Sequence, residues 1–414
     1  MNSITIVTIF FIVYLVVLKR KRGGWLYPSI FLVSIYMLSI ICLIIDIASG
    51  NTHEVLKTQY LLPALFFVFL CVLYFVPFTS FREDKVEEIV LPSKKVMDII
   101  SVVLIILSFE SIFFFAGSVR AVFSYGDLGA ARDDRYIYGI SFVEHSIWYT
   151  VSSVSASLYM FDILFYFIYR IIEGKNGVRT ALLLVGSFSE TFHVLSEAGR
   201  DGIVFWFFAF IFIYLIFRPF LEKKQRSSMA KRFVIIAFII MIPFTMISKG
   251  RFNDYTNNSY IDYMGQPFKH FCYFFDFSPL PVNYGHGFPL FFEVLHMPHP
   301  QYYEYKNALT SSTAFGTFFR EFLVNFGVAG TIIVGFIMAF LFRATMRSNG
   351  KTLFFNQFFI YILYFQIFSQ GVFYFRQYTR GGNLFIVMCL LFTLLFKSNF
   401  GKDTKPVVIK RNVE

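Results

Sequence analysis

Long apolar segments recur along the whole of this sequence, and they constrain the fold more than any other feature. A helix that crosses the hydrocarbon core of a bilayer needs about 20 mainly apolar residues. By that measure about eleven segments are predicted to be spans. They run near residues 3–18, 27–49, 60–81, 96–118, 146–169, 179–196, 202–218, 233–248, 322–342, 353–374 and 382–397. The sequence therefore predicts an all-α polytopic membrane protein, with residues 1–414 as a single transmembrane domain.

The charge content agrees with this class. Charged residues make up 15% of the chain, whereas soluble domains carry about a quarter. The net charge of +11 does not indicate nucleic-acid binding, because Lys and Arg of membrane proteins gather in cytoplasmic loops. The four cysteines are scattered without a CxxC pair, so we expect no disulfide framework, metal or cofactor. The basic residues of the first apolar segment follow it, which indicates an uncleaved helix.

The distribution of Lys and Arg predicts the orientation. With the N-terminus outside, the inner loops hold roughly twice as many of these residues as the outer ones. The tail at 398–414 is then cytoplasmic. Residues 119–139 form an outer loop, and residues 249–313 form one large outer loop.

The large loop is rich in Tyr, Phe, His, Asn and Pro, which is typical of a folded surface that handles a polar ligand. Aromatic faces stack on the C–H surfaces of sugars, so Tyr263 and, in the earlier loop, Tyr136 are predicted sugar contacts. His296 and His299 are interleaved with prolines in HMPHP, and they do not share a helix face as zinc ligands would. A His or a carboxylate of these loops remains an unassigned candidate base.

Arginine dominates the charges predicted to face outward. Its planar guanidinium binds phosphate and carboxylate and stays charged at any relevant pH. The alternative for each arginine is an interfacial anchor or an ion pair with a neighbouring acid. Arg200 is the strongest candidate, because its turn is too short to leave the membrane region, although Glu197 and Asp201 flank it. The candidates are Arg132, Arg135, Arg200, Arg251, Arg320, Arg376 and Arg380.

Four motifs give the sequence a family likeness. They are GDLGAARDDRY at 126–136, LSEAGRDG at 195–202, SKGRFNDY at 248–255 and TAFGTFFREFLVNFGVAGTIIVGF at 313–336. With these motifs, the span count and the late outer loop, the sequence resembles the O-antigen polymerase (Wzy) family. The resemblance implies a GT-C-like fold in a bacterial inner membrane, with a periplasmic N-terminus and a cytoplasmic C-terminus.

The resemblance also implies a reaction. A glycan on undecaprenyl pyrophosphate is transferred to the hydroxyl of a second lipid-linked repeat unit, without metal or other cofactor. Arg200, Arg251 and Arg320 would then be catalytic. Arg132, Arg135, Tyr136, Tyr263, Arg376 and Arg380 would bind substrate. The implied partners are undecaprenyl-pyrophosphate-linked oligosaccharides and membrane lipid, with room for a chain-length regulator and no nucleic acid.

Three alternatives stay open from the residues alone. An O-antigen ligase would use a similar donor but another acceptor. A transporter of lipid-linked sugar would have broken helices and polar residues along a path at mid-membrane. The sequence instead places its polar groups mainly on one face, which favours surface chemistry. A non-catalytic membrane scaffold with an outer binding loop is the third.

Overall fold

The computed structural model forms two compact units. Unit 1 comprises Met1–Lys85, Asn257–Gly350 and Asn356–Thr393, and unit 2 comprises Val86–Thr256, Lys351–Phe355 and Leu394–Glu414. The structure describes residues 3–49, 60–125, 130–131, 134, 139–143, 146–174, 177–252, 260–277, 285, 287–298, 315–347, 350–398 and 405–412.

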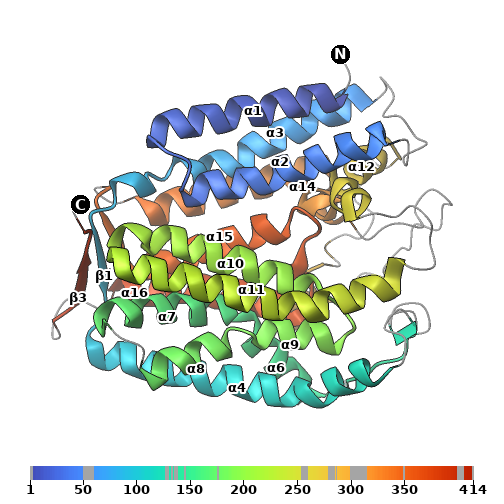
Figure 1. The fold of residues 1–414 in the computed structure, drawn as a ribbon. Coiled ribbons are helices and arrows are strands. Elements are labelled where there is room, and N and C mark those ends of the chain that lie inside the picture. The colour runs from blue at the N-terminus through green and yellow to red at the C-terminus, as the bar shows by residue number, and fades with distance from the viewer. Residues whose placement is uncertain are drawn as a thin grey trace. The chain divides into compact units, whose positions relative to one another are not determined.

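Unit 1 is built on helices from both ends of the chain (Figure 1). They are α1 (Ser3–Arg22), α2 (Pro28–Ala48), α3 (Leu61–Ser80), η2 (Glu83–Lys85), α12 (Tyr260–Phe277), α13 (Pro289–Val294), α14 (Thr317–Met346), most of α15 (Phe355–Gln370), η4 (Arg376–Tyr378) and most of α16 (Arg380–Ser398). Aromatic side chains fill its core, where the ring of Phe75 lies 6.0 Å from Phe319 and 5.3 Å from Phe368. The hydroxyl of buried Tyr36 donates to the Phe368 carbonyl at 2.7 Å, which satisfies a polar group that burial would otherwise penalise.

Helix α12 lies inside the region predicted as the large outer loop, yet it is packed against α2. A Cβ at Gly265 would lie 2.8 Å from the backbone N and Cα of Leu43, so only glycine permits this approach. The Ser39 hydroxyl donates to the Met264 carbonyl at 2.7 Å across the same contact. The predicted loop thus contains a helix that belongs to the body of unit 1.

A buried ion cluster joins the end of α1 to the end of α3. The Arg22 guanidinium, 4% exposed, bonds Glu83 at 2.8 Å and Asp84 at 2.6 Å. Its Nη2 also donates to the Thr79 carbonyl at 2.7 Å, and Arg82 bonds the other side of Asp84 at 2.6 Å. Arg22 is therefore a structural cation as well as a predicted cytoplasmic charge.

Unit 2 contains the middle of the chain. Its helices are α4 (Lys94–Ser124), α6 (Ile147–Ser157), α7 (Tyr159–Ile172), α8 (Val178–Gly186), α9 (Ser189–Ser196), α10 (Asp201–Phe217), η3 (Arg218–Phe220) and α11 (Lys223–Phe252). The predicted span 146–169 is a pair, α6 and α7, bent by 42° at Leu158. The predicted span 179–196 is likewise divided into α8 and α9.

Unit 2 also holds a small β-sheet that the all-α prediction missed. The strands are β1 (Glu88–Leu91), β2 (Thr352–Phe354) and β3 (Val407–Lys410), in the order β2-β1-β3. Strand β1 pairs in parallel with β2, Ile89 opposite Leu353, and antiparallel with β3, Ile89 opposite Ile409. These three residues are buried. The strands come from segments predicted to lie at or next to the inner face, and that orientation stays a prediction.

Among the described residues, six helices are long and apolar enough to cross a membrane, and the bent pair of α6 and α7 makes a seventh. The six are Ser3–Arg22, Pro28–Ala48, Leu61–Lys85, Lys94–Ser124, Asp201–Phe220 and Thr317–Met346, with Arg380–Phe396 as a shorter apolar helix. This supports a multi-pass membrane protein.

Candidate functional site

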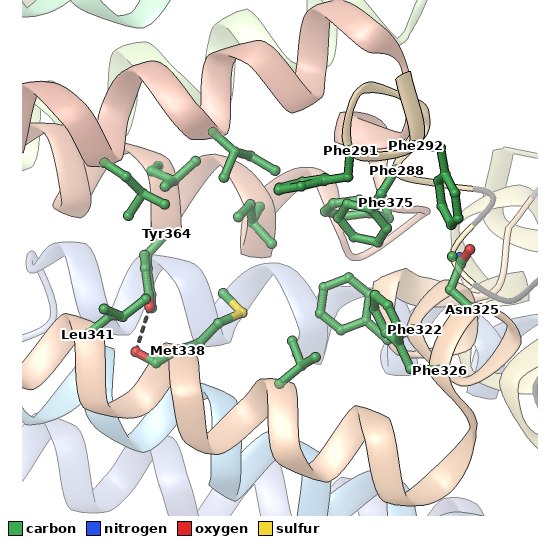
Figure 2. Close-up of a pocket in the computed structure, with 16 residues that line it drawn as sticks. Phe288, Phe291, Phe292, Phe322, Asn325, Phe326, Met338, Leu341, Tyr364 and Phe375 are labelled. Atoms are coloured by element: carbon green, nitrogen blue, oxygen red, sulfur yellow. Dashed lines mark hydrogen bonds between the residues drawn. The ribbon is translucent and has the colours of Figure 1, made fainter. Parts of the chain in front are cut away.

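Unit 1 contains an apolar cavity of about 620 Å³ between α14, α15 and α16 (Figure 2). One end is aromatic, and α13 covers it with Phe288, Phe291 and Phe292. The other end is lined mainly by aliphatic side chains from the three long helices. The remaining lining residues are Gly285, Phe322, Asn325, Phe326, Val334, Met338, Leu341, Leu363, Tyr364, Ile367, Phe375, Ile386 and Leu390. Such walls suit a hydrocarbon chain and leave little for a polar ligand to bind.

A break in α14 lies beside this cavity. Gly327 takes φ 68° and ψ −177° within the helix, a backbone that is essentially confined to glycine. It separates the aromatic lining residues Phe322 and Phe326 from the aliphatic ones that begin at Val334. The Thr331 hydroxyl donates to the carbonyl of Gly327 at 2.7 Å, so a side chain satisfies a backbone group at the break.

Two buried asparagines fix the chain segment that leads into α13. Gly287 N donates to Asn325 Oδ1 at 2.8 Å, and Asn383 Nδ2 donates to the carbonyls of Gly287 at 3.3 Å and Gln377 at 2.6 Å. Asn383 Oδ1 in turn accepts from Leu290 N at 3.3 Å. The amides of α14 and α16 thereby hold the aromatic cover of the cavity. Sequence reasoning missed both residues, although Asn325 interrupts an apolar run and Asn383 directly precedes one.

Arg376 and Arg380 flank the aromatic end. Arg376 follows the lining residue Phe375, and its Nη1 donates to the Tyr374 hydroxyl at 2.8 Å. Arg380 begins α16 and pairs with Glu293 of α13 at 2.6 Å, with side chains 64% and 42% exposed. Such an exposed pair is weak. Both predicted binding arginines thus lie next to residues that enclose the cavity.

Arg320, in the first turn of α14, has a different setting. Its Nη2 bonds Glu321 at 2.6 Å, and its side chain lies over Gly316, where a Cβ would be 2.3 Å from Arg320 Cδ. The pairing with a neighbouring acid, weighed from the sequence as the alternative to phosphate binding, is therefore present.

The segment entering α14 is held by His270 and Tyr263 of α12. His270 Nδ1 donates to the Phe315 carbonyl at 2.6 Å, and the Tyr263 ring lies 4.3 Å from that of Phe315. Burial lowers the pKa of His270 to about 4 against the effect of this hydrogen bond, and the nearby charges of Arg320 and Lys269 act in the same direction as burial. His270 is therefore neutral at neutral pH. His270 was not predicted from the sequence. Tyr263 was predicted as a sugar contact, but its packing against Phe315 was not predicted.

Arg200 belongs to unit 2, in the tight turn between α9 and α10. It is 7% exposed, and its guanidinium carbon lies 5.6 Å from the ring centroid of Phe244, within the range of a cation–π contact. Added Cβ atoms at Gly199 and Gly202 would lie 2.7 and 2.9 Å from the side chain of Val194. The two glycines allow the turn to pack closely on Val194. The turn is short, as predicted, and its position in the membrane stays a prediction.

The other predicted residues lie at the edge of the described chain or outside it. Arg251 stands in the last turn of α11, because residues 249–252 continue that helix, and its side chain is not described. Arg132, Arg135 and Tyr136 lie outside the described residues. In the same predicted outer loop, Asp134 accepts a hydrogen bond from the Tyr125 hydroxyl at 3.0 Å.

The middle of unit 2 carries polar groups that correct one expectation from the sequence. Asp162 of α7 bonds Ser108 of α4 at 2.5 Å, and Glu110 of α4 bonds Ser152 of α6 at 2.6 Å. Polar groups therefore do not gather only at the outer face. The sequence concealed this because each acid interrupts an otherwise apolar run.

The chain matches no known protein family, no curated protein sequence and no solved structure. Within the described ranges, no group of three or more His, Cys, Asp or Glu side chains is arranged to hold a metal ion. The features that bear on function are therefore the cavity, the arginines, and the two acids Asp162 and Glu110 between the helices of unit 2.

Proposed function

We propose that the protein is a membrane glycosyltransferase that polymerises oligosaccharide repeat units carried on undecaprenyl pyrophosphate. The observation that carries this proposal is the apolar cavity of unit 1, whose aromatic end adjoins Arg376 and Arg380. A lipid-linked pyrophosphate combines an apolar tail with a concentrated negative charge. A hydrocarbon-lined cavity beside two arginines is suited to both parts.

The cavity would take part of the polyprenyl tail. Its lining is almost entirely hydrocarbon, and its two polar lining groups are engaged within the protein, Asn325 with Gly287 and Tyr364 with the Met338 carbonyl at 2.5 Å. The entry of an apolar chain would therefore break no hydrogen bond of the protein and leave no polar group of the lining without a partner. Burial of apolar surface contributes about 25 cal/mol per Å².

The arginines would bind and stabilise the pyrophosphate. In the proposed reaction the acceptor hydroxyl oxygen attacks the anomeric carbon of the donor, and the bond from that carbon to the pyrophosphate breaks. The acceptor hydroxyl gives its proton to a base, an unassigned His or carboxylate of the loops, and undecaprenyl pyrophosphate leaves with the added negative charge. Fixed guanidinium groups stabilise charge that develops on a leaving group. Arg200, Arg251 and Arg320 remain the proposed catalytic set, with Arg132, Arg135, Tyr136, Tyr263, Arg376 and Arg380 in substrate binding.

The proposal includes the finer topology. About eleven spans would have a GT-C-like arrangement in a bacterial inner membrane, with an outer N-terminus and an inner C-terminus. Residues 249–313 would then face outward, and α13 would lie over the cavity at that face. The substrate would be lipid-linked oligosaccharide, and a chain-length regulator would be an additional partner.

Filling the cavity tests this function. We expect Val334→Trp to abolish long-chain surface polysaccharide, because Val334 lines the cavity and an indole would occupy the space of the lipid tail. Ile333→Trp is the matched control, since Ile333 is the preceding residue and is 58% exposed. Each variant replaces the native protein in cells, insertion is checked in membranes, and chain length is read from the gel ladder.

The ladder also separates a polymerase from a ligase. Loss of a polymerase leaves single repeat units attached, whereas loss of a ligase removes all attached glycan. Polysaccharide of normal length in an inserted Val334→Trp variant would contradict a lipid-binding role for the cavity.

A transporter of lipid-linked sugar is the second candidate, and unit 2 supports it. The bent pair of α6 and α7 and the embedded Asp162 are features that transporters share. Proteoliposomes that contain the full chain and lipid-linked oligosaccharide in one leaflet distinguish the two. Longer glycans indicate a polymerase, and movement of unaltered glycan to the other leaflet indicates a transporter.

A further inference from the structure

The carboxyl group of Asp162 is enclosed where three helices of unit 2 meet. Asp162 of α7 is 0% exposed, and its Oδ2 accepts a hydrogen bond from Ser108 of α4 at 2.5 Å. A Cβ at Gly186 of α8 would lie 3.0 Å from Ser108 Cβ and 3.7 Å from Asp162 Cγ. Helix α8 therefore packs directly on the pair. Among the described residues, Asp162 Oδ1 has no hydrogen-bond partner.

The pair lies near the middle of membrane-length helices. Ser108 stands at the centre of α4, which runs Lys94–Ser124. Asp162 lies in the first turn of α7, just after the bend between the two halves of the α6–α7 pair. An ionisable group at this depth is costly and usually marks a functional position.

The basic side chains of the surrounding helices bond other groups or lie further from Asp162 along their helices. Arg179 of α8 bonds Asp98, which also accepts from the Tyr169 hydroxyl at 2.7 Å. Arg170 of α7 is eight residues from Asp162, about 12 Å along the helix. The other ionisable groups of the packed helices are Lys94, Lys95, Glu110 and Arg120 of α4, Tyr149 of α6, Tyr159 and Tyr166 of α7, Glu190 and His193 of α9, Glu197 and Arg200 of the turn after it, and Asp201 and Tyr214 of α10. A charged Asp162 would thus have a single hydroxyl as its visible support.

Both neighbouring breaks in the helices bring polar atoms to this depth. The Ser189 hydroxyl, at the start of α9, donates to the Ala156 carbonyl near the end of α6 at 3.4 Å. Glu110, two residues beyond Ser108, accepts from Ser152 at 2.6 Å, and its Oε2 has no hydrogen-bond partner among the described residues. In the other direction along α4, the Ser101 hydroxyl donates to that of Tyr169 at 3.4 Å. Separate hydroxyl and carboxyl groups therefore lie on both sides of Ser108 along α4.

We propose that Asp162 is a proton-binding site at mid-membrane, with Ser108 as its hydrogen-bond partner and Glu110 as the next acid toward the C-terminal end of α4. The Asp162 carboxylate takes up a proton to form the neutral acid, and loss of that proton restores the carboxylate. Its two oxygens and one hydroxyl suit a proton better than a metal cation, which would need several more oxygen ligands. This proposal does not depend on the proposed polymerase activity.

Infrared difference spectroscopy of the reconstituted full chain tests this proposal. Titration with pH should reveal a C=O stretching band of a protonated carboxylic acid that disappears as the pH rises. We expect this band to be lost in Asp162→Asn and kept in Asp98→Asn, the matched control whose acid pairs with Arg179 at the N-terminal end of α4.

Two further variants keep the test decisive if Asp162→Asn does not fold. Ser108→Ala retains the acid but removes its hydrogen bond, so the band should move to higher frequency and its titration midpoint should shift. Ser152→Ala, which alters only the partner of Glu110, should leave the Asp162 band in place. A band that is unchanged in Asp162→Asn, or one that does not respond to pH, would overturn the proposal.

Discussion

At the scale of single residues, buried polar side chains arrange the site of unit 1. Asn325 and Asn383 hold the segment before α13, and His270 holds the Phe315 carbonyl. None of these residues belongs to a recognisable motif. Asn325 and His270 have mainly apolar or aromatic neighbours in the sequence, and Asn383 follows two glycines. The arginines were predictable because charge is rare in such a sequence. The pairing of Arg380 with Glu293 was not, since these two residues become neighbours only through the fold.

His270 makes stability dependent on pH. Its pKa in the fold is about 4, below the ordinary value of 6.5. As the pH falls, the unfolded chain therefore takes up the proton first. The stabilising contribution is fully present above about pH 6.5 and is lost as the pH falls toward about 4.

We expect His270→Asn to lose less thermal stability than the native protein between about pH 7 and about pH 5, because Asn cannot be protonated and can still donate to Phe315. Unfolding midpoints of the full chain in detergent measure this difference. His296→Asn is the control, because His296 is exposed at φ 51° and Asn tolerates that backbone. Equal losses in His270→Asn and the native protein would refute the assignment.

At the scale of elements, the sequence predicts where apolar segments lie but not where a helix bends or where a polar segment is helical. The bend at Leu158 has no Pro or Gly at that position, so the segment 146–169 reads as one continuous span. Helix α12 carries Pro, His and Tyr among its apolar residues, and it therefore reads as a loop. In both cases tertiary packing overrides the local pattern.

The close packing of α12 on α2 gives a prediction about glycine. Gly265→Ala should destabilise the protein by about 1–3 kcal/mol, because its Cβ would lie 2.8 Å from the Leu43 backbone. Gly117→Ala is the matched helical control, with nothing within 4 Å of the added Cβ, and it should be neutral or stabilising by up to about 1 kcal/mol. Denaturation of both purified variants measures the contrast. Equal effects would mean that the helices can separate without cost.

At the scale of the whole molecule, apolar length and charge predicted a multi-pass helical protein, and the helices support this coarse class. The β-sheet was not predictable, because its strands are three or four residues long and far apart in sequence. Division into two compact units was equally hidden, since unit 1 is assembled from three separate stretches.

The predicted orientation can be tested on the sheet. In a Cys42→Ser background, Glu87→Cys and Lys405→Cys should react with a membrane-impermeant maleimide only from the cytoplasmic side, and Ile140→Cys only from the other. All three positions are exposed in unit 2, and the other native cysteines are buried. Sealed vesicles of known sidedness provide the measurement. Reaction of the first two from opposite sides would be incompatible with the sheet, and reversal of all three would invert the topology.

The sheet also has a consequence for biosynthesis. Its central strand, β1, is made early, whereas Thr352, which bonds Glu88 at 2.7 Å, is 264 positions later. Strand β3 is later still. Until both neighbours emerge from the ribosome, β1 presents two unpaired edges, the kind of surface that invites pairing with other chains. Newly made protein should therefore be most vulnerable to aggregation and proteolysis during this interval, and the pairing of β3 would be a late step in maturation.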